Sequence, residues 1–419
     1  MSSETHRDME LSATGLLSAE QVSRLEEHWI TTLEQFLILG ANQDRRTCGA
    51  KLLGVEGEAF DGMIDRAKAL APELAAEAVA YPYEDFLGCL EPTGEAVQAP
   101  VPEEFLAAAG PLPEGANLIA KMNGVRDQGR RGACVAFAST AMREYLTGRR
   151  EYELSEQFLY WVCKERDGQA GAGTYLSVAL GALLEVGICR AQEWAYNPNP
   201  IDGNEGQGPP PLGAEALAAK HRLAKSFCLV PRPGAPVQMG QFKACLGGSS
   251  ARPIAFSVPL FDSFFNQATR RTGRVIMPLP GESVRGGHAM CVVGYQDYAG
   301  VPGGGLFLVR NSWGEGWAYG CEFGPGHALI PYKYVQQHCW EAYSGDAAGV
   351  SAAAPRRAAE RAQTRLQTDY GFCAACGKRI LTQLDIAGQC MADGCEAPLC
   401  NHCYTGLGRR TCRKHEKPR

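Results

Sequence analysis

The chain has 419 residues, more than one ordinary hydrophobic core accommodates, and this length predicts two or three domains. Its hydrophobic fraction of 45% and charged fraction of 21% are typical of a globular protein, and the net charge of -5 argues against a chain-wide role at nucleic acids or membranes. Because it has neither a run of roughly 18 apolar residues nor an apolar signal peptide at its start, we expect a cytoplasmic protein without a membrane span.

Residues 1–75 are predicted to form a small all-α domain. Residues 18–21 have the form of a capping box, and residues 32–35 can restart a helix after a bend. Apolar residues follow at helical spacing: Val22, Leu25, Trp29, Leu33, Phe36 and Leu37. The short helices and tight turns resemble helix-hairpin-helix and SAM-like modules, which implies a protein-interaction domain. No basic cluster accompanies them, which argues against nucleic-acid binding.

The middle of the chain predicts an α+β domain of two lobes. Residues 76–115 are rich in Pro, Glu and Ala and are expected to be an extended connector. The large domain, residues 116–345, has a helical half and then a strand-rich half, with the active-site cleft expected between the lobes. Helices are predicted over 135–146, 156–164 and 176–186, and strands over 253–258, 289–295 and 305–310.

Cys134, His288 and Asn311 are the side chains from which a cysteine acyl-transfer site is built. Cys134 directly precedes an apolar helical pattern, and the helix N-terminus is expected to lower the pKa of its thiol. His288 would hold the proton and Asn311 would orient the imidazole, with Trp313 shielding their hydrogen bond from water. The amide of Gln128, with the backbone N–H of Cys134, would form an oxyanion hole.

These residues lie in four blocks that resemble the papain-like cysteine peptidases, in that family's order. The blocks are Gln128-Gly129 through Gly132-Ala133-Cys134, Leu154-Ser155-Glu156-Gln157, Gly287-His288-Ala289 with Val293-Gly294-Tyr295, and Asn311-Ser312-Trp313-Gly314 with Trp317. The resemblance covers residues 116–345 and implies the papain fold. It also implies that Cys134 is the nucleophile, with His288 as base and acid. Asn311 would be the orienting group and Gln128 the oxyanion donor.

The chain also departs from the family's pattern. Val135 follows the nucleophile where the family usually has an aromatic residue, and Arg131 replaces a disulfide-forming cysteine. The second departure fits a reducing cytoplasm and resembles bacterial members of the family. The resemblance implies substrate-binding roles for Gly173 and Trp313, although Ala172 replaces the first glycine of the family's Gly-Gly pair. The helical inhibitory propeptide of secreted members is not recognisable, so the first 115 residues would restrain the enzyme in another way.

After an Ala- and Arg-rich linker over 346–371, residues 372–419 are predicted to form a zinc module. Seven of the 17 cysteines lie here, and together with one histidine they give eight ligands in four short-spaced pairs, enough for two structural zinc ions. The ligands are Cys373, Cys376, Cys390, Cys395, Cys400, Cys403, Cys412 and His415. Such pairs resemble RING, B-box and other treble-clef-like modules. Both interleaved and sequential pairing are open, and His402 is a rival ligand.

These patterns lead us to expect an intracellular cysteine endopeptidase that acts on a protein or peptide through a Cys134 thioester, with no cofactor in the reaction. The flanking modules would recruit its partner or substrate. Two alternatives are open. One is a related thiol acyl transfer, such as transpeptidation or processing of a ubiquitin-like tail. The other is a scaffold whose papain-like fold no longer turns over substrate.

Overall fold

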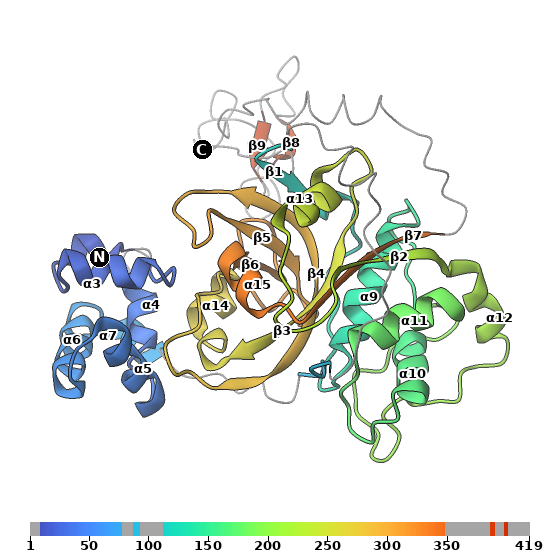
Figure 1. The fold of residues 1–419 in the computed structure, drawn as a ribbon, viewed down its shortest axis with the longest axis horizontal. Coiled ribbons are helices and arrows are strands. Elements are labelled where there is room, and N and C mark those ends of the chain that lie inside the picture. The colour runs from blue at the N-terminus through green and yellow to red at the C-terminus, as the bar shows by residue number, and fades with distance from the viewer. Residues whose placement is uncertain (1–8, 78–86, 93–111, 348–385, 390–397, 401–419) are drawn as a thin grey trace, which may run out of the picture. The chain divides into compact units, whose positions relative to one another are not determined.

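A computed structural model describes residues 9–77, 87–92, 112–347, 386–389 and 398–400 (Figure 1). The chain divides into two compact units, residues 1–350 and residues 351–419. In the second unit, β8 (Ile386–Gln389) and β9 (Pro398–Cys400) form an antiparallel pair. Among the helices described, none has both the length and the apolar composition needed to cross a membrane.

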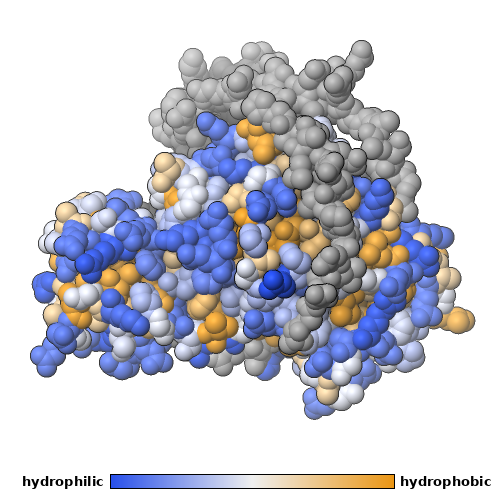
Figure 2. Space-filling view, viewed as in Figure 1, coloured by the Kyte–Doolittle hydropathy of each residue, from blue (hydrophilic) through white to orange (hydrophobic). Residues whose placement is uncertain are grey.

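Residues 9–77, called the helical module below, are helical as predicted. Their helices are α2 (Leu11–Thr14), α3 (Ala19–Glu26), α4 (Leu33–Ile38), α5 (Gln43–Leu53), α6 (Gly57–Leu70) and α7 (Pro72–Glu77). Capping boxes begin α3 at Ser18 and α4 at Thr32, so both sequence signals are confirmed. Figure 2 shows a mostly hydrophilic visible face over this module, since its apolar side chains lie in a shared core.

The first lobe of the large domain is helical. Its main helices are α9 (Cys134–Tyr145), α10 (Glu156–Asp167) and α11 (Leu176–Glu185), each within a few residues of its predicted range. Shorter elements are η2 (Ile119–Lys121), α12 (Ala214–Ala218) and η3 (Ala219–His221). Helix α9 is buried along almost its whole length because it packs against the other two helices and against the sheet of the second lobe.

The second lobe is built on an antiparallel sheet. Its strands are β1 (Gly115–Asn117), β2 (Leu223–Val230), β3 (Ile254–Phe261), β4 (Val284–Asp297), β5 (Gly305–Arg310), β6 (His327–Pro331) and β7 (Glu341–Ala347). The order is β2-β7-β3-β4-β5-β6, with β1 beside β4. Helices α13 (Met239–Gly247), α14 (Gln267–Thr272) and α15 (Tyr332–His338) flank it, and η4 (Asp262–Phe264) follows β3.

The arrangement agrees with the predicted α+β domain of two lobes. The three predicted strands correspond to β3, β4 and β5, and β5 has the predicted bounds. The helices α9–α11 lie on one side of the long strands β3 and β4, as Figure 1 shows. Residues from the start of α9, the middle of β4 and the end of β5 therefore meet where the lobes join.

Candidate active site

Cys134 is the first residue of α9, as its position before the apolar pattern predicted. Burial raises the pKa of the Cys134 thiol to about 11. The nearby backbone N–H groups of Ala289, Gly88 and Val135 act in the opposite direction, but their effect is smaller. The helix N-terminus alone predicted a lowered pKa; in this structure the fully buried sulfur lacks the water that would stabilise a thiolate.

His288 and Asn311 form a buried hydrogen-bonded pair. His288 lies on β4 opposite Val258 of β3, and Asn311 directly follows β5. The Nε2 atom of His288 is 2.8 Å from the Oδ1 atom of Asn311. Because an amide oxygen only accepts hydrogen bonds, Nε2 carries the proton in the neutral ring and Nδ1 carries the lone pair. Nδ1 is buried and has no hydrogen-bond partner among the residues described.

Trp313 lies against the imidazole of His288, with their ring centroids 4.8 Å apart. Phe264 and Phe265 pack against the indole in turn, at 5.8 and 6.3 Å. This aromatic cover agrees with the shielding role predicted for Trp313. Burial lowers the pKa of His288 to about 4, although its hydrogen bond to Asn311 acts in the opposite direction. The imidazole is therefore neutral around pH 7 in this conformation.

Gln128 is placed by the segment that carries Asn311. Its backbone N–H donates to the carbonyl of Ser312 at 2.8 Å, and its Oε1 accepts from the Ser312 hydroxyl at 2.5 Å. Its Nε2 donates to the carbonyl of Arg131 at 2.7 Å. The side-chain NH₂ of Gln128 is the group predicted to donate to an oxyanion. The structure thus brings together two of the four sequence blocks through the Gln128–Ser312 contacts.

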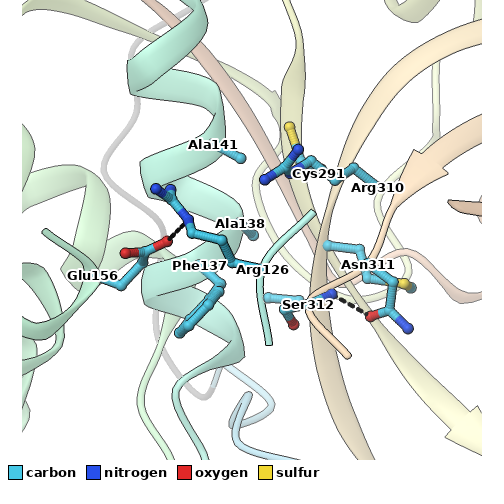
Figure 3. Close-up of a pocket in the computed structure, with 11 residues that line it drawn as sticks. Arg126, Phe137, Ala138, Ala141, Glu156, Cys291, Arg310, Asn311 and Ser312 are labelled. Atoms are coloured by element: carbon cyan, nitrogen blue, oxygen red, sulfur yellow. Dashed lines mark hydrogen bonds and ion pairs between the residues drawn. The ribbon is translucent and has the colours of Figure 1, made fainter. Parts of the chain in front are cut away.

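Behind Asn311 and Ser312, a buried charged network fills the junction between the lobes (Figure 3). Arg126 lies 2.7 Å from a Glu144 carboxylate oxygen and 2.6 Å from one of Glu156. Burial raises the pKa of Glu156, while Arg126 acts to lower it. The remaining cavity, about 10 Å³, has room for at most one water molecule. The network therefore supports the segment before Gln128 rather than forming a substrate pocket.

Residues 87–92, called the strap below, cross the site directly over Cys134. Cys89 pairs in parallel with Thr174 and antiparallel with Gly287. Its N–H donates to the Gly287 carbonyl at 3.1 Å, and the N–H of Leu90 donates to the carbonyl of Thr174 at 2.9 Å. The Thr174 N–H donates back to Gly88 at 3.0 Å. The strap therefore uses the backbone hydrogen-bonding groups on both sides of the nucleophile.

Close contacts between backbones hold the strap in place. A methyl group at Gly88 would collide with the carbonyl group of Gly132, two residues before the nucleophile. A methyl group at Gly173, a predicted substrate-binding residue, would lie 2.7 Å from Cδ2 of Leu90. Gly173 thus borders the strap, while the backbone pairing belongs to its neighbour Thr174. With the strap in place, both Cys134 and His288 are completely buried.

Some functional residues gave no usable sequence signal. The strap lies in the Pro-rich connector, where its extended residues show no periodic pattern. Thr174 and Gly287 act through backbone groups, which any residue type supplies. Ser312, in contrast, belongs to a recognised block, and its hydroxyl was a possible partner for a nearby amide. The remaining cysteines of the large domain are buried or half-buried thiols, as expected.

All eight predicted zinc ligands lie outside the residues whose side chains the structure describes. Within the described part of the chain, no group of three or more His, Cys, Asp or Glu side chains is placed to hold a metal ion. The zinc module therefore stays a prediction from the spacing of its cysteines.

Comparisons with known proteins agree with this geometry. Residues 116–321 match the family model described as papain family cysteine protease. An uncharacterized peptidase C1-like protein of Acanthamoeba polyphaga mimivirus is 28% identical over 219 residues, which cover 50% of this chain and 64% of that protein. The chain thus spans less than two thirds of the length of this curated relative.

Solved structures show a similar fold. The crystal structure of Xylellain, a cysteine protease from Xylella fastidiosa, matches with a TM-score of 0.50 and 21% identity over 63% of this chain and 96% of that one. A procathepsin B from Trypanosoma congolense matches with a TM-score of 0.49 and 17% identity over 68% and 97% of the two chains. At 21% identity, the Xylellain match supports a shared fold and nothing finer.

Proposed function

Residues 116–321 belong to the papain family of cysteine proteases, and on this premise we propose that the protein hydrolyses peptide bonds through a thioester on Cys134. The observation that carries the proposal is the His288–Asn311 pair. Among the described residues, it leaves the lone pair of Nδ1 without a partner, while the backbone N–H of the next residue, Ala289, is near enough to the sulfur of Cys134 to act on the pKa of its thiol. A base and a nucleophile are thus held in one site.

The reaction follows from these positions. Nδ1 of His288 takes the thiol proton, and the sulfur attacks the carbonyl carbon of the scissile bond. The oxyanion that forms is stabilised by the side-chain NH₂ of Gln128 and the backbone N–H of Cys134. The C–N bond then breaks as His288 returns its proton to the leaving amine. Water, activated by the same imidazole, hydrolyses the thioester and frees Cys134.

We further propose that the described conformation is a closed, resting one. Three observations support this: the strap pairs with the backbone groups of Thr174 and Gly287, the sulfur of Cys134 is fully buried, and burial raises the pKa of the thiol and lowers the pKa of the imidazole, so that both are neutral. An extended substrate would need the same groups of Thr174 and Gly287. Release of the strap is therefore required before a protein or peptide can bind.

We also propose that the protein acts in the cytoplasm. This is supported by the buried free thiols and by Arg131, which stands where the family has a disulfide-forming cysteine. This replacement also supports similarity to bacterial members. Two structural zinc ions in residues 372–419 are supported by the four ligand pairs, and metal analysis of the purified chain should find about two zinc per chain. If the chain is purified under reducing conditions and contains no zinc, that proposal is wrong.

Hydrolysis of fluorogenic peptides tests the proposed function directly. Wild type should cleave, Cys134→Ala should not, and Cys228→Ala, which alters a half-buried thiol elsewhere, should cleave like wild type. Added amines that capture the acyl group in preference to water would favour transpeptidation. Absence of turnover on peptide libraries, in a folded protein with its strap displaced, would favour the scaffold. A proteome-wide map of new N-termini after expression of wild type and Cys134→Ala would identify substrates.

A further inference from the structure

The helical module and the second lobe insert side chains into each other's cores. Trp29 of the module belongs to the hydrophobic core of the large domain. In return, Ile276 and Leu279 belong to the core of the module. Both come from the segment between β3 and β4, residues 262–283, called the β3–β4 insertion below. Such reciprocal burial is typical of parts that fold and act as one body rather than of a tethered interaction domain.

Polar contacts fix the same interface. The backbone N–H of Met277 donates to the carbonyl of His28 at 3.0 Å. A Glu34 carboxylate oxygen lies 2.5 Å from the guanidinium of Arg271. The guanidinium of Arg274 lies over the ring of Trp29, 4.5 Å from its centroid. The β3–β4 insertion is thus held by the helical module along most of its length.

Arg45 makes the most buried of these contacts. It is in the first turn of α5, is 2% exposed, and lies 217 positions from its partner in the chain. Its Nε is 2.6 Å from a carboxylate oxygen of Asp262, and its Nη2 donates to the carbonyls of Asp262 and Phe265 at 2.8 and 2.9 Å. One planar guanidinium therefore fixes both ends of a single four-residue turn.

That turn carries the aromatic cover of the active site. Phe264 stacks on Trp317 with centroids 5.9 Å apart and an interplanar angle of 4°, and it meets the edge of Trp313. Phe265 lies over Trp313 at 6.3 Å and 28°. Trp313 in turn packs on the imidazole of His288. Each step is a direct contact, so a displacement of the turn moves the indole that confines the imidazole.

We propose that the helical module is a structural part of the active site, and that Arg45 is a positioning residue that orients His288 through Phe265 and Trp313. The module's role is then to complete the catalytic geometry, in addition to any recruitment of partners. The contact path concerns the geometry alone; its effect on turnover rests on the proposed peptidase function. The two can be tested separately because the geometry has a readout that needs no activity.

The first arm measures hydrogen–deuterium exchange in the full-length chain. Arg45→Met should raise exchange at residues 262–265 and also at 311–317, which Arg45 does not touch. The matched control is Arg46→Met on the same helix, since Arg46 contacts Gly40 and Asp61 within the module. It should leave 311–317 unchanged. Unchanged exchange at 311–317 in folded Arg45→Met would overturn the proposal, whether or not the protein is a peptidase.

The second arm measures turnover of a fluorogenic peptide. Arg45→Met should lower kcat by about ten- to a hundredfold with little change in KM, because orientation of the imidazole is lost and substrate contacts are kept. Arg45→Lys, which keeps the charge beside Asp262 but lacks the planar fork, should recover part of kcat. Arg46→Met should change kcat by less than about twofold.

A double-mutant cycle separates the path from general loss of docking. If Arg45 acts through the ring of Phe265, then Arg45→Met should have little further effect on kcat in a Phe265→Leu background. Full additivity would contradict the path and indicate two independent structural effects. Exchange at 311–317 can respond to Arg45→Met while neither wild type nor any variant turns over peptide. In that case the positioning role stands and the peptidase proposal fails.

Discussion

The Nε2 atom of His288 lies 2.8 Å from the Oδ1 atom of Asn311 and fixes which ring nitrogen faces the nucleophile. Oδ1 also accepts the backbone N–H of Ser312 at 2.8 Å, so the amide cannot rotate without losing two hydrogen bonds. The sequence separation of 23 residues is bridged because β4 and β5 are antiparallel neighbours. This relationship determines the tautomer on which the proposed chemistry depends.

Asn311→Ala should lower kcat by about ten- to a hundredfold, because the imidazole loses its orienting partner while Cys134 is untouched. KM should change little, since the substitution keeps the backbone groups of Thr174 and Gly287. Steady-state kinetics on a fluorogenic peptide would measure both constants. Asn199→Ala, on an exposed loop, is the matched control and should behave like wild type. A wild-type kcat in Asn311→Ala would remove the orienting role.

Gln128→Ala should lower kcat by about a hundred- to a thousandfold, because one of the two oxyanion donors is lost. Alkylation of Cys134 by iodoacetamide forms no oxyanion, so its rate should change by less than about threefold. The comparison of the two rates separates stabilisation of the intermediate from nucleophilicity. Gln192→Ala, at an exposed glutamine, is the control. Equal losses in both rates would show that Gln128 acts on the thiol or on local folding.

Gly88→Ala should activate the full-length chain, because the added methyl group cannot fit against the Gly132 carbonyl while the strap is bound. Both the rate of peptide hydrolysis and the rate of Cys134 alkylation should rise, roughly tenfold or more if the strap is displaced most of the time. Gly57→Ala is the control, because a methyl group there meets no atom within 4 Å. Activity that stays at the wild-type level in Gly88→Ala would show that the strap does not restrain the site.

The pH dependence of Cys134 alkylation should differ between closed and open forms. In the closed chain burial raises the pKa of the thiol to about 11, so the rate should climb with pH up to that value as the thiolate fraction grows. In Gly88→Ala, water reaches the sulfur and removes much of the desolvation, so the inflection should move to lower pH. A profile with the same inflection in both proteins would contradict a closed resting state.

The sequence sufficed for the residues whose roles are local or carried by recognisable blocks. Cys134 begins α9 because a turn precedes an apolar helical pattern. The sequence placed His288 just before one predicted strand and Asn311 just after another, and the structure has His288 on β4 and Asn311 directly after β5. The sequence also predicted the capping box of α3 and the new helix start at α4, where the capping hydrogen bonds join residues three apart.

Contacts between distant segments could not be predicted in this way. The strap is an extended stretch whose partners, Thr174 and Gly287, lie far along the chain and contribute only backbone groups. Nothing in the sequence distinguishes Arg45 from the other charged residues of the helices, and only the fold shows that it lies beside Asp262. The net pKa of Cys134 also depends on burial by the strap, which outweighs the local effect of the helix N-terminus. Each of these features is set by tertiary packing rather than by local pattern.

The central claim is that Cys134 is the nucleophile, and intact-mass analysis after treatment with an epoxide-type thiol inhibitor tests it most directly. The Gly88→Ala chain should gain one inhibitor mass, peptide mapping should place it on Cys134, and peptide hydrolysis should stop in proportion to labelling. The same chain with Cys134→Ala should gain no mass and show no hydrolysis. Unlabelled Cys134 together with hydrolysis that persists in Cys134→Ala would contradict the account.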